Sequence, residues 1–499
     1  MKVLLVHPSA LMYSEIFLRL EPLGLESIAR SIRLEGHEVR LLDLQVFSHK
    51  EYLQELPHFG PQAIGFSLNY FANVPEVIDL AKVTRQILPK SFIFVGGHSA
   101  SFIPESILEH AQEAIDCVVV GEGELTTVRL LESLPATTFH KIPGVVAHDG
   151  RGPKPELISD INQLKPARDL TRKRRKYFIG GLDPCASIEF ARGCQWDCSF
   201  CSAWTFYGQK YRTVDPRIAA QNLAAISEPN VFITDDVAFV DPDQGLAIGR
   251  EIERRNIRKR YYLETRADVL LRNLDLFAYW KRLGLTNIFL GIEAIDEETL
   301  RRLRKRTDTG GNFKALEAAR KIGLVVALNI IADPDWDEKR FEVVRNWAIS
   351  VPEIVHLTIN TPYPGTEVWH KEAPELTTLD YRLYDIQHAV KPTRLPLKKF
   401  YEELVSTQGV LNRKHLGLKG LWDVFGMAAS LCLRGHTNFV KMLWKFSDVY
   451  NPERQLADHH REIRYRLTPP VKSDSPPCRK ALYVHETKAA CRRSRDCQA

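Results

Sequence analysis

The chain has 499 residues, which is too long for one ordinary hydrophobic core, so we expect two or three domains. Hydrophobic residues make up 44% and charged residues 26% of the chain, the balance of a globular protein in water. The net charge of +6 is mild over this length. It does not require a nucleic-acid partner, although it favours an anionic membrane surface or anionic small molecules.

Nine cysteines, three of them clustered, indicate a reducing compartment and a metal site rather than a disulfide framework. The first apolar run is too short for a signal peptide. No stretch of about 18 uncharged apolar residues is present that could cross a bilayer. We therefore expect a cytoplasmic protein, and peripheral contact with a membrane surface stays open.

Residues 1–140 alternate short apolar runs with amphipathic helical patterns, such as Leu23–Leu34 and Val74–Leu88. This alternation predicts an α/β domain with a Rossmann-like, doubly wound parallel sheet. The expected strands are Val3–Val6, Val39–Leu42, Ala63–Ser67, Phe92–Val95 and Cys117–Val120.

Ligands of such sheets bind beyond the carboxyl ends of the strands, where this chain carries small and glycine-rich turns. A nucleotide is disfavoured because no G-x-G-x-x-G follows the first strand, and a module without any cofactor is the other alternative. The candidate ligand-binding residues are Ser9, Ala10, Ser67, Leu68, Asn69, Gly96, Gly97, His98, Gly121, Glu122 and Gly123.

Residues 141–185 read as a linker rich in Pro, Lys and Arg. Its charge run, 172–176, is expected to be a solvated face, since runs of like charge usually are. A nucleic-acid surface would need interleaved aromatic residues and a wider basic area, so no nucleic-acid partner is expected.

Strand–helix alternation resumes in residues 186–370, where six βα units predict an open, partial (β/α)6 barrel. Chemistry in such barrels lies at the carboxyl ends of the strands. A single acidic residue there is equally well explained as a helix cap, but the joint placement of several favours a site. The candidates are Cys194, Cys198, Cys201, Asp235, Asp236, Glu264, Arg266 and Glu293.

The three cysteines have the spacing C-x3-C-x2-C. Three thiolates can hold three irons of a cubane and leave the fourth iron open. Structural zinc would need a fourth protein ligand, and the chain has no histidine between His148 and His356. An iron–sulfur site is therefore favoured over zinc, and over three buried free thiols.

Residues 371–467 are expected to form a helical extension. Its apolar stretch with interspersed basic residues, 416–447, suits either a substrate cap or membrane-surface helix, or a helix packed on the barrel. Residues 468–499, with paired prolines and scattered charge, suggest a disordered tail.

The cysteine motif, with Phe200 before its last cysteine, resembles the radical S-adenosylmethionine (SAM) family. In that family the open iron of a [4Fe-4S] cluster binds SAM, and one electron cleaves SAM to a 5′-deoxyadenosyl radical. The resemblance implies that Asp235 and Asp236 contact the SAM amino group. It places Glu264 and Arg266 at the ribose and carboxylate, and Glu293, in the family's G-x-E strand, beside the adenine and methionine.

The N-terminal pattern resembles the cobalamin-binding domain that precedes many radical SAM domains. The D-x-H-x-x-G histidine that ligates cobalt from below is missing, since the first strand runs into His7-Pro8-Ser9. The resemblance is thus to the subgroup that binds cobalamin without a protein histidine on cobalt. His98 could substitute as a ligand, but lining the pocket from its turn is the favoured role.

Together these resemblances imply a cobalamin-dependent radical SAM methylase that methylates an unactivated sp3 carbon and depends on a flavodoxin- or ferredoxin-type electron donor. Residues 7–15 and 201–208 are similar to the hopanoid C-3 methylases, which act on ring A of a pentacyclic lipid. Alternatives are a tetrapyrrole cyclase with the same two domains, a methylase of another terpenoid or natural product, and a corrinoid-sensing or electron-transfer module. The aromatic residues that would suit a flat apolar substrate are Trp196, Phe200, Trp204, Phe206 and Tyr207.

Overall fold

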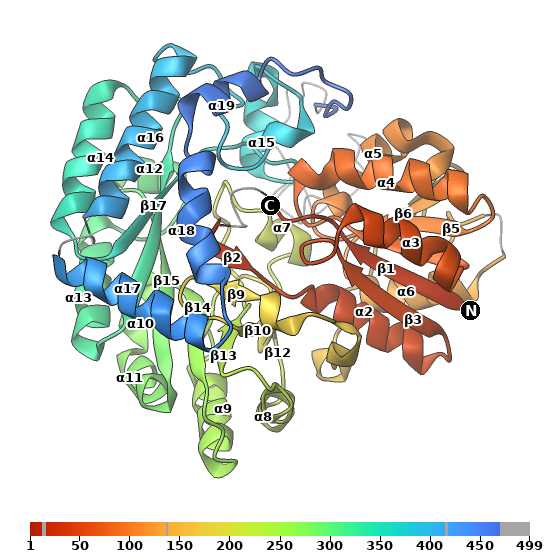
Figure 1. Ribbon diagram of the computed structural model, residues 1–499, viewed down its shortest axis with the longest axis horizontal. Helices are drawn as coiled ribbons and strands as arrows, with labels where there is room; N and C mark the ends of the chain where they lie inside the picture. Colours follow the sequence, from red (N-terminus) through yellow and green to blue (C-terminus); the bar gives the residue numbers. More distant parts are fainter. Residues whose placement is uncertain (12–15, 136–137, 415–417, 470–499) are drawn as a thin grey trace, which may run out of the picture.

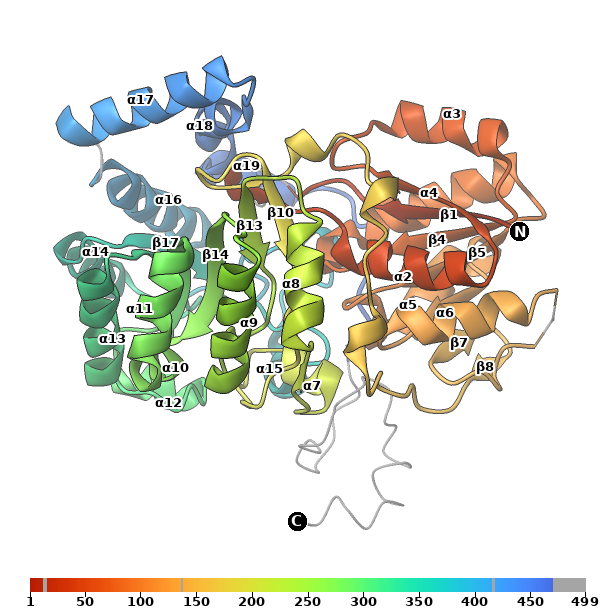
Figure 2. The same ribbon diagram turned by 90° about the horizontal axis from the view of Figure 1, so that it is seen from below.

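The structure is a computed structural model that describes residues 1–11, 16–135, 138–414 and 418–469 (Figure 1). Most of the expected tail, 468–499, lies outside the described residues. Two sheets, each built mainly of parallel strands and covered by helices, lie side by side, and a helical C-terminal part contacts both (Figures 1 and 2). This is the expected α/β class.

The N-terminal sheet has the strand order β3-β1-β4-β5-β6-β7-β8, parallel from β3 to β6 and antiparallel at the last two strands. The chain leaves β1 toward β3 on one side and returns to β4 on the other, so the topological switch lies between β1 and β4. The strands are β1 (Lys2–His7), β3 (Glu38–Asp43), β4 (Ala63–Ser67), β5 (Phe92–Gly96), β6 (Cys117–Val119), β7 (Val145–Ala147) and β8 (Gly150–Arg151).

Alternate residues of β1 face opposite sides of this sheet, as the two-residue period of a strand requires. Leu4 and Val6 join the core under one set of helices, while Val3 and Leu5 join the core under the other. The first set is α3 (His49–Phe59), α4 (Val74–Ile87) and α5 (Pro104–Ala111); the second is α2 (Leu23–Leu34) and α6 (Gly123–Glu132). Burial on both faces explains why the strands are continuous apolar runs.

The second sheet has six parallel strands in chain order, and its first and last strands do not pair within the described residues, so the barrel stays open. A helix or helix pair follows each strand and covers the outer face (Figure 2). The strands are β10 (Cys185–Ile188), β13 (Asn230–Ile233), β14 (Arg260–Arg266), β15 (Leu285–Glu293), β16 (Val325–Ala332) and β17 (Ile354–Ile359).

Five of the helices around this barrel begin at an aspartate whose carboxylate accepts backbone N–H groups of the first turn. The capping residues are Asp215, Asp241, Asp296, Asp308 and Asp337. The capped helices are α8 (Pro216–Ala224), α9 (Pro242–Arg254), α12 (Glu297–Arg302), α13 (Thr309–Ile322) and α14 (Glu338–Ser350). Two further helices, α10 (Ala267–Arg272) and α11 (Leu274–Leu283), follow β14 without such a cap.

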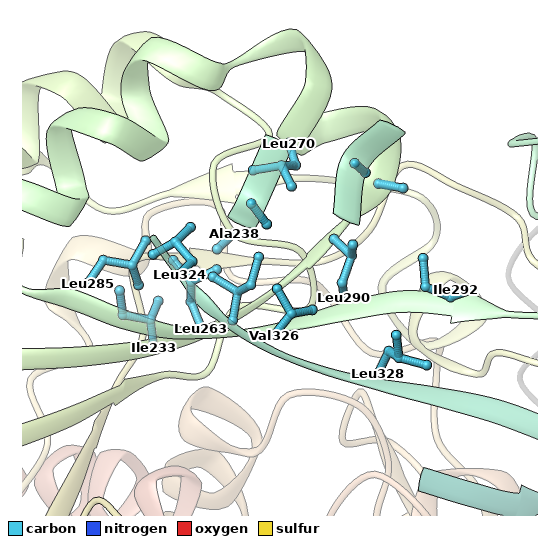
Figure 3. Close-up of a cluster of buried hydrophobic side chains, with 14 of the residues drawn as sticks. Ile233, Ala238, Leu263, Leu270, Leu285, Leu290, Ile292, Leu324, Val326 and Leu328 are labelled. Carbon is cyan, nitrogen blue, oxygen red and sulfur yellow. The ribbon is translucent and has the colours of Figure 1, made fainter. Parts of the chain in front are cut away.

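The barrel core lies between the strands and these helices (Figure 3). Leu263, Leu290 and Leu328 come from three successive strands, and each is fully buried. Their neighbours along β14 and β16, such as Tyr262 and Asn329, point to the other side and are half-exposed. The outer face is therefore the packed one, and the inner face of the open barrel remains accessible.

The segment between the sheets ties them together. Its charge run was expected to be solvated, but Arg174 is only 21% exposed at its side chain. Its Nη1 lies 2.7 Å from the Glu21 carboxylate of the N-terminal part, and its Nε donates to Glu228 of the barrel at 2.7 Å. In the same segment, β9 (Phe178–Ile179) pairs with β2 (Leu18–Arg19). Arg174 is therefore not solvated as expected: it bridges the two sheets, because a buried carboxylate of each part faces it.

The C-terminal part consists of α15 (Glu367–Glu372), α16 (Leu397–Arg413), α17 (Leu418–Leu433), α18 (Asn438–Val449) and α19 (Pro452–Asp458). Helix α16 packs on α14 and α19. His388 docks this part: its Nδ1 lies 3.0 Å from Asp385, and its Nε2 lies 3.4 Å from Asp458 of α19. These two carboxylates outweigh the effect of burial and raise the pKa of His388 to about 9.

Candidate functional site

The cysteine loop follows β10 and is held at several points. Two short strands, β11 (Ala191–Arg192) and β12 (Arg212–Thr213), pair across its base, and α7 (Ala203–Tyr207) follows its last cysteine. The indole N–H of Trp204 donates to the Cys198 carbonyl at 2.9 Å. Gly193 has φ +98°, and a Cβ there would lie 1.9 Å from the Lys210 carbonyl oxygen, so only glycine fits before Cys194.

The three thiols lie at the carboxyl end of the first barrel strand. Cys194 and Cys198 are buried, and Cys201 is half-buried. Burial raises the pKa of Cys194 to about 11 and raises the pKa of Cys201 still further above its usual value. Such thiols keep their protons unless a metal replaces them.

Within the described part of the chain, no three His, Cys, Asp or Glu side chains converge as the ligands of a single metal ion would. A cubane binds each cysteine through a different iron, so its ligands need not converge on one point. The three thiols on this constrained loop therefore fit a cubane.

Three carboxylates from successive strand ends gather beside this loop. Burial, with repulsion from Asp236 and Glu293, raises the pKa of Glu264 to about 7. Burial also raises the pKa of Asp236 to about 6, although the Gly193 N–H donates to this carboxylate at 3.1 Å. Carboxylates that oppose each other's ionisation attract a cationic ligand, and SAM carries both an ammonium and a sulfonium. This acidic rim therefore fits SAM.

Glu293 and Arg266 are held by neighbours on the same rim. Lys305 Nζ lies 2.9 Å from Glu293 Oε1, and Glu293 itself has φ +66°, a left-handed backbone that functional sites often retain. Arg266 Nε donates to Asp268 at 2.8 Å, and Nη1 donates to Cys198 Sγ at 3.6 Å. The Arg266 guanidinium also lies 4.5 Å from the ring centre of Trp196. Arg266 thus joins the acidic rim to the cysteine loop.

Asp235 and Asp236 are adjacent in sequence but face different surroundings. Asp235 is 5% exposed and accepts the backbone N–H groups of Phe190 and Ala191 at 2.8 and 3.0 Å. Burial raises its pKa well above the usual range. Asp235 therefore holds the start of the cysteine loop in place. Asp236 is the member of the pair whose charge raises the pKa of Glu264.

A cavity lies beyond the carboxyl ends of β1, β4, β5 and β6 and is closed on its far side by the barrel. Every candidate ligand-binding residue of the N-terminal domain lines this cavity except Leu68, whose side chain is buried in the core. The candidates that line it are Ser9, Ala10, Ser67, Asn69, Gly96, Gly97, His98, Gly121, Glu122 and Gly123.

Glycines of the strand-end turns, Gly96, Gly97, Gly121 and Gly123, form a glycine floor in part of the cavity. Gly97 has φ +115°, and a Cβ there would lie 2.8 Å from the Leu68 carbonyl oxygen and from Asn69 Oδ1. Gly121 also has a left-handed φ, +81°. Glycines place no side chain at these points of the floor, so a broad, flat ligand can approach the strand ends there, as a corrin ring requires. The turns therefore fit cobalamin.

His98 lines the cavity, but its Nε2 lies 2.8 Å from Ser202 Oγ. Its ring packs against Phe102 and Phe206, and burial lowers its pKa to about 4, so it is neutral. His7 is turned toward Asp43, at 3.5 Å. His98 thus lines the cavity, and its role toward a bound cofactor stays a prediction.

Sequence reasoning missed several lining residues. Tyr70 directly follows the expected Ser67–Asn69 turn and could have been included on that ground. Glu189, Arg192 and Thr234 come from the barrel, and nothing in the sequence places them against the N-terminal turns. Phe206 and Tyr207, expected beside the cysteine loop, also form part of this cavity wall.

Two family models match this chain: the B12 binding domain over residues 11–131 and the radical SAM superfamily over residues 188–348. The hopanoid C-3 methylase of Methylococcus capsulatus is 55% identical over 99% of this chain and 97% of its own length. The chain belongs to the hopanoid C-3 methylase family of cobalamin-dependent radical SAM enzymes.

Two solved structures share the fold of this family member. The cobalamin-dependent SAM radical enzyme OxsB, with aqua-cobalamin bound, aligns with a TM-score of 0.64 at 15% identity and covers 92% of this chain and 80% of its own. The methyltransferase TsrM from Kitasatospora setae, with cobalamin and a [4Fe-4S] cluster bound, aligns with a TM-score of 0.60 at 18% identity and covers 79% of each chain.

As a member of the hopanoid C-3 methylase family, the protein is a radical SAM methyltransferase that uses a [4Fe-4S] cluster, SAM and cobalamin. The chemistry of the thiol loop, the acidic rim and the glycine floor fits these three cofactors. None of the helices in the described ranges has the length and apolar composition needed to span a membrane.

Proposed function

We propose that this enzyme methylates C-3 in ring A of a hopanoid lipid. The identity of 55% along 99% of the chain carries this proposal. It extends over residues 349–467, beyond both family-model matches, and so includes the region expected to distinguish substrates within a large superfamily. An unactivated ring carbon is no nucleophile, so its methylation needs cofactor chemistry that side chains cannot supply.

We assign the cofactors to the residues gathered above. Cys194, Cys198 and Cys201 would hold the cluster. Asp236, Glu264 and Glu293 would bind the cationic part of SAM, Arg266 would bind its carboxylate, and Asp235 would act through the loop it shapes. The residues assigned to cobalamin are Ser9, Ala10, Ser67, Asn69, Gly96, Gly97, His98, Gly121, Glu122 and Gly123, with Leu68 supporting their turns from the core.

When bound, the cluster and SAM supply a hydrogen-abstracting radical, and cobalamin supplies the methyl group. The chain's own residues orient these groups. Arg192, before the first cysteine, and Phe206 and Tyr207, after the last one, line the barrel side of the cavity, and the glycine floor lies on the other. Hydrogen removal and methyl delivery would therefore meet between the two sheets. The cluster also needs an electron donor, which we propose to be of the flavodoxin or ferredoxin type.

We further propose that α17 and α18 bring the enzyme to an anionic membrane that holds its lipid substrate. Trp422, Phe425 and Leu433 of α17 are 76%, 68% and 90% exposed, and Trp444 of α18 is 82% exposed. Figure 2 shows α17 at the outer edge of the molecule. The neighbouring residues Arg434, Lys441 and Lys445 are exposed and basic, which suits anionic headgroups.

The lipid product tests the substrate. Hopanoid-producing cells with and without the protein are compared by mass spectrometry of extracted lipids, with a Cys198→Ala variant as the inactive control. We expect hopanoids one methyl group heavier, with the methyl on ring A, only with the intact protein. Absence of this product while purified enzyme still cleaves SAM would refute the substrate and leave the enzyme class intact.

Vesicle flotation tests the membrane surface. We expect the protein to float with phosphatidylglycerol vesicles, and the Trp422→Ala/Trp444→Ala variant to remain at the bottom of the gradient. Phe313→Ala is the matched control, because Phe313 is an exposed aromatic residue of α13, 48% exposed. Unchanged flotation of the double variant would refute this surface, as would a dimer in solution that the same substitutions dissociate.

A further inference from the structure

A buried arginine joins the cysteine loop to the cobalamin cavity. Arg192 lies two residues before Cys194, in the loop that follows the first barrel strand, and its side chain is 8% exposed. Two of its three carboxylate partners, Glu122 and Glu124, belong to the turn after β6 and the start of α6 in the N-terminal domain. The chain separation is 68 to 70 residues, so the contact is purely tertiary.

Every nitrogen of the Arg192 guanidinium is engaged. Nη1 donates to Glu122 at 3.0 Å, Nη2 donates to Glu124 at 2.8 Å, and Nε donates to Glu189 at 2.8 Å. The second oxygen of Glu122 accepts from Arg212 and from the Ile158 N–H, both at 2.7 Å. A planar guanidinium can satisfy carboxylates in three directions, whereas a lysine ammonium is a single point charge.

The other end of the loop touches the same cavity. Ser202 directly follows Cys201, and its Oγ lies 2.8 Å from Nε2 of His98, in the turn after β5. Helix α7, which begins at the next residue, lies between the barrel and the N-terminal sheet in both views (Figures 1 and 2). The segment that carries the three cysteines is therefore fastened to the cobalamin turns before its first cysteine and after its last.

We propose that Arg192 is a positioning residue that couples cobalamin binding to the order of the cysteine loop, with Glu124 as its partner. A ligand that fixes the turns at Glu122–Glu124 also fixes the loop that Arg192 holds, so the second cofactor meets a site already ordered. Such coupling is reciprocal: each cofactor raises the affinity for the other by the same factor. The inference concerns the two cofactor sites and is independent of the substrate.

The test measures binding of hydroxocobalamin to the full-length protein, cluster-free and after anaerobic cluster reconstitution. In wild type we expect cobalamin to bind the cluster-loaded form at least about fivefold more tightly. In Arg192→Lys and in Glu124→Gln this ratio should fall below about twofold, because the three-way contact is broken while the cysteines and the cavity floor stay in place. The rate of cluster loss to an iron chelator, with and without cobalamin, should change in parallel.

Arg320→Gln is the control, since Arg320 of the outer helix α13 makes a bidentate pair with the buried Glu353, at the amino end of β17 and away from both cofactor sites. It should lower stability and leave the ratio of the two cobalamin affinities unchanged, which separates coupling from general weakening. Equal cobalamin affinity of wild type with and without the cluster would overturn the inference. So would a full wild-type ratio in Glu124→Gln, the variant expected to disturb the fold least.

Discussion

Glu264 offers a sharp test of the acidic rim, because its neighbours set its charge state. Burial and repulsion from Asp236 and Glu293 raise its pKa to about 7. A group with this pKa is about 90% ionised at pH 8 and about 10% ionised at pH 6. Because the cationic groups of SAM bind the ionised carboxylate, we expect the apparent affinity for SAM to fall about tenfold from pH 8 to pH 6 through this residue alone.

The same shift can be expressed as a free energy. The pKa of Glu264 rises from 4.5 to about 7, and one pKa unit corresponds to about 1.4 kcal/mol. At pH 8 the ionised side chain therefore costs the folded protein at most about 3 to 4 kcal/mol, less where solvent reaches this half-buried group. A bound cation relieves this cost, which is the physical reason that the rim should prefer SAM to a neutral analogue.

The assay is anaerobic equilibrium dialysis of SAM against reconstituted wild type and Glu264→Gln at pH 6, 7 and 8. The amino group of SAM itself titrates near pH 8, but it does so equally for both proteins, so the difference between their slopes reports Glu264. Glu253→Gln, a substitution remote from the rim on α9, should keep the wild-type slope. Identical slopes for wild type and Glu264→Gln would refute the reasoning.

Three further predictions follow from single contacts. Gly97→Ala should weaken cobalamin binding about tenfold or more with the fold intact by circular dichroism, because φ +115° and the close Leu68 backbone strain any side chain there; unchanged affinity would contradict the glycine floor. Cys198→Ala should abolish the iron–sulfur absorbance and iron content after reconstitution, while Cys432→Ala, at an exposed cysteine, should retain both. His388 has a folded pKa of about 9 against 6.5 unfolded, so its contribution of about 3 kcal/mol is fully present below pH 6.5 and is lost as pH rises through 9. Urea unfolding at pH 6 and pH 9.5 should show this loss in wild type and not in His388→Gln.

The positions of most strands and helices along the chain follow from local pattern. Ala63–Ser67 was expected as a strand and forms β4, and Leu23–Leu34 was expected as a helix and forms α2. Strands buried on both faces carry continuous apolar runs, which can be read without knowing their neighbours. The first barrel strand, β10, begins two residues before the expected Ser187, because pairing with β13 rather than hydrophobicity sets its start.

The short antiparallel strands β7 and β8 lie within residues expected to form a linker. Three apolar residues, Val145–Ala147, are too few to display a period, so only the neighbouring β6 makes them a strand. The solvated reading of the 172–176 run failed at Arg174 for a similar reason. Its partners Glu21 and Glu228 are distant in sequence, and only folding brings them to it.

By itself, the sequence indicated the cofactor chemistry: three thiols at a fixed spacing, acidic residues at strand ends, and glycines in the turns that follow the strands. These depend on residue type and short-range spacing. Only the tertiary structure decided which of two adjacent aspartates faces the acidic rim, and that Arg192 reaches across to Glu122 and Glu124. Such facts depend on side-chain direction and on contacts between distant segments, and the local sequence constrains neither.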